Sequence, residues 1–151
     1  MKTARNLLAG LGGALAVNLL HEALKKNVKN APRLDKLGEE AVQKTAIEAG
    51  EPIQSKDKLY ATALGADLVA NTMYFAMIGA GNPKHVWPKA VGLGVTAGTG
   101  AITLPSALGL NGSQTKKTTK TKSMTMGYYL FGALVTAGIL KFMDRRHVLA
   151  S

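Results

Sequence analysis

Residues 59–81 read LYATALGADLVANTMYFAMIGAG, an apolar run that contains a single charged side chain, Asp67. A helix needs about 20 mostly apolar residues to cross a hydrocarbon core about 30 Å thick. Three further runs meet this requirement, at residues 7–24, 90–110 and 126–143. Because these runs are apolar all round rather than along one stripe, they fit lipid better than water. The sequence therefore predicts an all-α, polytopic membrane protein with four transmembrane helices in a compact bundle.

The 151 residues carry a formal net charge of +10, and almost all of the charged side chains lie outside the four apolar runs. No stretch is left over for a separate soluble domain, so residues 1–151 are interpreted as a single membrane domain. Excess Lys and Arg beside membrane spans is typical of loops that face anionic lipid headgroups. We therefore expect the lipid bilayer, and no nucleic acid, as the partner of the basic segments. The sequence contains no cysteine, which excludes disulfides and thiolate chemistry.

Two segments between the spans have their own character. Residues 32–49 predict a fifth helix, because Leu34, Leu37 and Ala41 follow helical spacing. The narrow apolar stripe fits an amphipathic helix that lies on the membrane surface or docks against the bundle, and a solvated helical arm is the alternative. Residues 111–123, NGSQTKKTTKTKS, are basic and of low complexity, which favours a flexible loop.

The connections predict how the spans are arranged. Residues 82–85, NPKH, form a short turn, so the spans at 59–81 and 90–110 are expected to be antiparallel neighbours. Trp87 and Tyr128 lie near span ends, where interfacial aromatic residues are common. The first and third loops carry more Lys and Arg than the opposite side, and the positive-inside rule then places both termini outside. We expect a multi-pass protein of a bacterial inner (cytoplasmic) membrane.

The chain contains 17 glycines, although glycine costs about 1 kcal/mol relative to alanine in the interior of a soluble helix. In lipid, small residues instead let helix backbones approach closely and pack. Gly94 and Gly98 are four residues apart in the third span, and Gly65 and Gly132 stand in similar small-residue patterns in the second and fourth. We expect these four glycines to form packing surfaces within the bundle and towards other membrane subunits or a second copy of the chain.

Asp67 is the strongest candidate for a functional residue, because a carboxylate inside a span is costly and usually faces the bundle interior with a partner. Asn71 follows one turn later on the same face. At matching depth the first span offers Asn18, with His21 and Glu22 nearer the surface. Together the five residues predict a line of polar groups that runs inward as a candidate ion or proton path. The alternative is that their hydrogen bonds only hold the helices together.

Two functions remain open at this point. The small-residue helix faces favour a small integral membrane protein of structural or accessory type. The alternative is a small proton- or cation-coupled channel or transporter that uses the Asp67 carboxylate. We do not expect an enzyme, because the sequence has no paired histidines and no carboxylate pair at catalytic spacing. No cofactor and no metal site are predicted.

Overall fold

The computed structural model describes the backbone of residues 2–149 and the side chains of residues 2–146, and every element in this part of the chain is helical. In chain order the elements are α1 (Lys2–Lys25), α2 (Leu34–Glu48), α3 (Lys56–Ala76), η1 (Met77–Gly79), η2 (Pro83–His85), α4 (Val86–Ala107), α5 (Ser113–Lys116) and α6 (Thr119–Leu149). Four helices are long and apolar enough to cross a membrane: α1, α3 with η1, η2 with α4, and α6. The prediction of an all-α chain with four such helices is confirmed.

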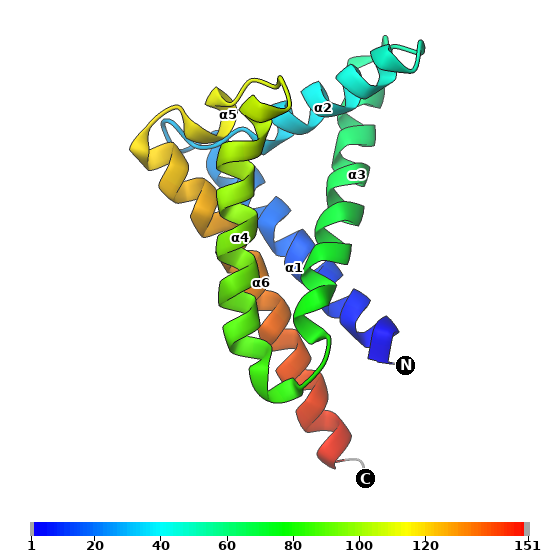
Figure 1. Ribbon diagram of the computed structural model, residues 1–151, viewed down its shortest axis with the longest axis vertical. Helices are drawn as coiled ribbons and strands as arrows, with labels where there is room; N and C mark the ends of the chain where they lie inside the picture. Colours follow the sequence, from blue (N-terminus) through cyan, green and yellow to red (C-terminus); the bar gives the residue numbers. More distant parts are fainter. Residues whose placement is uncertain (1, 150–151) are drawn as a thin grey trace.

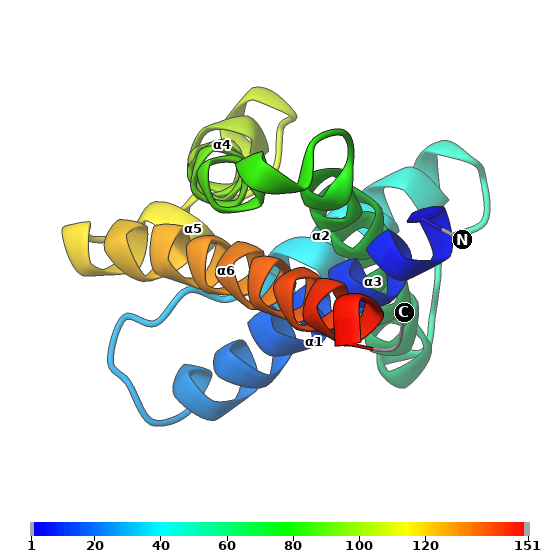
Figure 2. The ribbon, with the colours of Figure 1, turned by 90° about the horizontal axis from the view of Figure 1, so that it is seen from below.

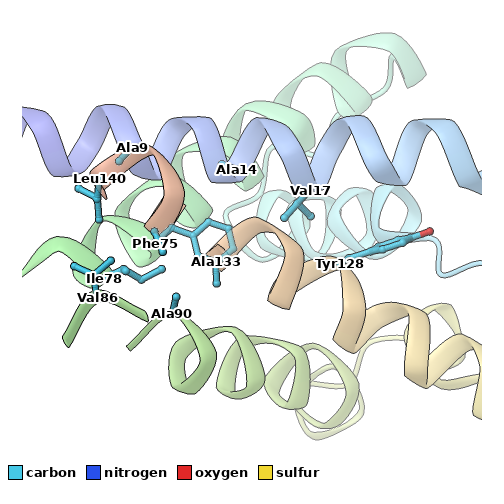
Figure 3. Packing of buried hydrophobic residues seen from close by; sticks show 11 residues of the cluster. Ala9, Ala14, Val17, Phe75, Ile78, Val86, Ala90, Tyr128, Ala133 and Leu140 are labelled. Carbon is cyan, nitrogen blue, oxygen red and sulfur yellow. The ribbon is translucent and has the colours of Figure 1, made fainter. Parts of the chain in front are cut away.

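The outer surface of the long helices is apolar, unlike that of a water-soluble bundle. Large apolar side chains point outward, as in Leu19 and Met73, which are 70% and 63% exposed. The buried cluster combines small residues, among them Ala9, Ala14 and Ala133, with larger side chains such as Phe75 and Leu140 (Figure 3). In lipid this arrangement costs nothing, because the outer surface meets acyl chains and the small residues let the helices approach closely.

The long helices pack as a row in the order α3, α1, α6, α4. Figure 2 shows α6 lying between α1 and α4. α3 and α4 are antiparallel, as expected, but they meet only near the η1–η2 connection, where the Tyr74 hydroxyl donates to the Leu93 carbonyl over 2.9 Å. From there they diverge, and α2 lies across the gap at the far end (Figure 1). The expected neighbours are therefore not packed side by side, and the bundle is open on one side.

The glycines explain why α4 lies on α6 rather than on α3. A Cβ atom at Gly94 would lie 3.0 Å from the Leu130 Cα, and one at Gly98 would lie 2.9 Å from the Met126 Cα, so both glycines serve the α4–α6 contact.

The other two glycines singled out in the sequence differ from each other. Gly132 lies against α1, because a Cβ atom there would lie 2.9 Å from the Gly13 carbonyl oxygen. Gly65 differs from the sequence expectation, since a Cβ atom on it would meet nothing within 4 Å. Gly65 therefore takes no part in packing within the chain.

The basic segment 111–123 is not the flexible loop that its composition predicts. It contains α5 and the first turn of α6, and its threonines hold it in place. The buried Thr115 hydroxyl donates to the Ala101 carbonyl over 2.7 Å, and the buried Thr121 hydroxyl donates to the Asn30 carbonyl over 2.8 Å. Hydrogen bonds from buried hydroxyls fix the segment against the first loop and the end of α4, while its lysines remain available to solvent.

α2 is docked on the bundle rather than extended as a free arm. Gly109, with φ of 72°, ends α4 in a Schellman turn, in which the Leu110 amide donates to the Pro105 carbonyl over 2.8 Å. Two α2 side chains complete this helix end. Lys44 Nζ donates to the Leu108 carbonyl over 2.7 Å, and the Glu40 carboxylate accepts from the amide of Asn111 over 2.9 Å. α2 therefore ties the end of α4 to the start of α3.

Candidate functional site

The Asp67 carboxylate joins α1 to α3. The Asn18 amide donates to Oδ2 over 2.9 Å, and the Asn71 amide donates to Oδ1 over 2.9 Å. The Asn18 amide also donates to the Ala14 carbonyl of its own helix over 3.0 Å, which fixes its orientation. Three of the five residues predicted for the polar line are thus in direct contact, and each oxygen of the carboxylate has a neutral amide donor.

His21 and Glu22 belong to a second cluster nearer the end of α1. The His21 side chain is buried, with Nε2 at 3.5 Å from Asp35 Oδ1 and Nδ1 at 3.7 Å from Glu22 Oε1. Its ring meets the Tyr128 ring edge-on, with centroids 6.3 Å apart. Tyr128 is itself buried and packs over the His21 ring. Glu22 is half-exposed and accepts hydrogen bonds from Lys25 and Tyr60.

Asp35, in the first turn of α2, is the member of this cluster that sequence reasoning missed. Its side chain is only 7% exposed, and the Arg33 guanidinium donates to both carboxylate oxygens over 2.9 and 2.7 Å. Burial alone would raise the pKa of Asp35, but the neighbouring His21 and Arg33 side chains outweigh it and hold the pKa well below its ordinary value. The pairing of Arg33 with Asp35 at the start of a predicted helix was the available signal.

A small cavity of about 30 Å³ lies between the two clusters. Its lining includes Asn18, His21, Asp35 and Asp67. A polar cavity of this size is large enough for a water molecule. Four of the five residues predicted as a polar line thus border this space, and Asn71 does not. No hydrogen bond joins His21 or Glu22 to Asp67 within the described residues.

A larger groove, which we call the α3–α4 groove, lies where these two helices diverge. Its volume is about 680 Å³, and Tyr129 of α6 and apolar residues of α2 contribute to its lining. α4 presents small side chains to it, at Ala97, Gly100 and Ala101, while α3 presents polar ones, among them Asp67. Asp67 therefore faces both the small cavity and this groove. The groove could not be foreseen from the sequence, because it arises from the divergence of helices that a short connection joins.

Among the described residues, no group of three or more His, Cys, Asp or Glu side chains is placed to hold a metal ion. Comparison with protein-family models, with curated proteins and with solved structures found no match. The polar clusters, the cavity and the groove are the features of this chain that bear on its function.

Proposed function

We propose that the chain is an integral membrane protein of structural or accessory type, and that the α3–α4 groove receives a transmembrane helix of another membrane subunit. The observation that carries this proposal is the open row of helices. α3 and α4 diverge from one end and leave a groove of about 680 Å³ on the outside of the bundle. Small-residue helix faces with no neighbour in the chain are suited to contacts with a further helix.

The placement in a membrane is supported by the outward-facing apolar side chains on the long helices. Leu8, Leu19, Val69 and Leu104 are all more than half exposed, which water would penalise and acyl chains would not. The first and third loops lie together at one end, joined by the hydrogen bond from Thr121 to the Asn30 carbonyl. The larger number of basic residues at that end supports a cytoplasmic position for these loops, with both termini outside a bacterial inner membrane.

The lining of the groove favours a helix over an acyl chain as its occupant. Ala97, Gly100 and Ala101 give α4 a smooth face on which another backbone can lie closely. The Asp67 carboxylate also lines the groove. If an acyl chain filled the groove, the carboxylate would face hydrocarbon, which carries a high free-energy cost. A carboxylate has about four acceptor positions, and two amides leave room for a further donor. The expected partner helix therefore carries small residues and one amide, hydroxyl or basic side chain.

Site-specific crosslinking tests this proposal, because the absence of native cysteine makes every introduced cysteine unique. Ala97→Cys places a thiol in the groove, and Val95→Cys is the matched control on an exposed position of the same helix that does not line the groove. After labelling with benzophenone maleimide in native membranes, we expect A97C to crosslink to a second membrane chain and V95C to give no such product.

Filling the groove provides the second arm of the test. Ala97→Trp is expected to abolish co-purification of the crosslinked chain in mild detergent, while Val95→Trp retains it. The proposal fails if A97C gives only lipid adducts, if both cysteine variants crosslink equally, or if A97W retains the partner.

A second candidate function, a proton- or cation-coupled channel or transporter, is favoured by one observation. His21, Asp35 and Asp67 line the same small cavity, which is large enough for water between the two clusters. The imidazole of His21 and the two carboxylates are groups that can accept and release protons, so they suit proton transfer at this point. In this function Asp67 would accept the proton or bind the cation on its way through the bundle.

Flux measurements separate the two functions. Proton or cation flux is measured in proteoliposomes. If Asp67 carries the ion, Asp67→Asn is expected to abolish this flux. If Asp67 has only a structural role, the variant and the wild type should show the same flux, or both should show none. Asparagine keeps one acceptor oxygen, which can face Asn18, and its amide nitrogen can donate to Asn71 once the Asn71 amide turns over, so the bundle should still assemble.

A further inference from the structure

A second groove, which we call the terminal groove, lies between the first residues of α1 and the last described residues of α6. Its volume is about 850 Å³. Three basic side chains line it, Lys2 and Arg5 from α1 and Arg146 from α6. Exposed apolar side chains form the rest of its wall, chiefly Leu8 and Phe142, which are more than half exposed. An apolar groove bordered by cations is unusual for a helix pair that faces only acyl chains.

Charged and apolar residues follow the same order on both walls. From Lys2 to Leu8, α1 runs about 9 Å along its axis towards the middle of the bundle, at about 1.5 Å per residue. From Arg146 back to Phe142, α6 runs about 6 Å in the same direction. The ion pair between Arg5 and Asp144 shows that these two helix ends lie side by side. Each wall is therefore basic at its outer end and apolar at its inner end.

Local contacts keep the groove basic. Asp144 offsets one of the three positive charges, that of Arg5. The charges of Lys2 and Arg146 therefore leave the groove with a net positive charge. The Arg146 guanidinium lies 4.9 Å from the centre of the Phe142 ring, a cation–π contact that holds it over the apolar wall. The groove along α2 at the opposite end is different, because Lys36 and Lys44 alternate there with three glutamates.

We propose that the terminal groove binds an anionic phospholipid. Its phosphodiester lies among Lys2, Arg5 and Arg146, and an acyl chain lies along Leu8 and Phe142. Charge complementarity selects an anionic headgroup, since basic pockets beside membrane helices attract such lipids, and the order from basic to apolar along both walls matches the order from phosphate to acyl chain. The inference rests only on the membrane placement in the proposed function and does not depend on the partner helix.

Lipid titration of the full chain tests the proposal. Purified protein in neutral detergent is titrated with phosphatidylglycerol or with phosphatidylcholine of the same acyl chains, and bound lipid is measured by native mass spectrometry. We expect wild type to bind phosphatidylglycerol at least tenfold more tightly. The double variant Lys2→Gln, Arg146→Gln should bind phosphatidylglycerol about 30-fold more weakly than wild type, because each basic residue near anionic lipid contributes about fivefold.

Two further variants distinguish a groove from diffuse charge attraction. Lys117→Gln, Lys120→Gln removes two exposed charges at the opposite end and should leave the affinity unchanged. Ala4→Trp fills the groove while keeping every cation, and it should weaken phosphatidylglycerol binding as strongly as the double variant. Equal affinity for the two lipids, an unaffected double variant, or full binding by A4W would each overturn the proposal. Recovery of the chain in a detergent-free soluble fraction would overturn the membrane placement as well, whereas loss of the partner helix alone would not.

Discussion

Replacing Gly10 with alanine is expected to force α1 and α3 apart. A Cβ atom on Gly10 would lie 2.8 Å from the backbone nitrogen of Ala76 and closer still to the carbonyl oxygen of Thr72. Ordinary contacts begin at 3.4 Å, so the Ala76 contact alone requires a shift of ~0.6 Å and the closer Thr72 contact requires a larger one. Neither obstacle is a flexible side chain. Overpacking of this kind typically costs about 1–3 kcal/mol. Alanine regains about 1 kcal/mol in helix propensity, so we expect a net loss of up to about 2 kcal/mol.

Gly65→Ala is the matched control, because the same methyl group added to α3 meets nothing within 4 Å. It should leave stability unchanged or raise it by up to about 1 kcal/mol. Stability is measured by SDS titration of the purified protein in mixed micelles, followed by the fluorescence of Trp87, the single tryptophan. If G10A unfolds at the same SDS fraction as G65A or at a higher one, the close approach of α1 and α3 is wrong.

Two further predictions concern the end of the molecule that carries α2. Because the pKa of Asp35 in the folded chain is held below its ordinary value of 3.8, its contribution to stability is fully present above pH 3.8. The contribution starts to fall below that pH and is lost as the pH approaches the lower folded-state pKa. Asp35→Asn should therefore be less stable than wild type at pH 7 in SDS titrations, and the difference should narrow by pH 3; a constant difference would contradict this. Thr121→Val removes the hydroxyl bound to the Asn30 carbonyl, at a cost of about 1 kcal/mol, and should speed tryptic cleavage in residues 111–123. Thr103→Val, whose hydroxyl bonds only within its own helix, is the control and should be cleaved like wild type.

The sequence predicts the features that depend on composition and on how far a residue lies from the end of its helix. The four long helices follow from the length of the apolar runs alone. The contact of Asp67 with Asn18 could be foreseen as well, because both residues lie at a similar distance from the connection between their spans. Helical periodicity then placed Asn71 on the same face as the carboxylate.

The arrangement of the helices could not be foreseen, because a short connection brings two helix ends together without fixing the angle between them. Gly65 and Gly94 stand in similar sequence patterns, yet only Gly94 is covered, since that depends on which neighbour each face meets. Asp35 was missed for a related reason. Asn30 adopts a left-handed backbone conformation, with φ of 63°, in the short turn that leads back to the buried His21, and such a reversal leaves no periodic pattern.

The packing order of the helices also governs how the protein can be assembled. The contacts between α1 and α3 can all form once these two helices are present, and the Asn18–Asp67 hydrogen bond can already join them. α4 has no such partner at that stage, because its main neighbour is α6, which follows it along the chain. Until α6 has packed between them, the surfaces of α1 and α4 that it covers are open to other helices. Incorrect pairing of α1 or α4 with another helix is therefore expected before α6 has packed, and not afterwards.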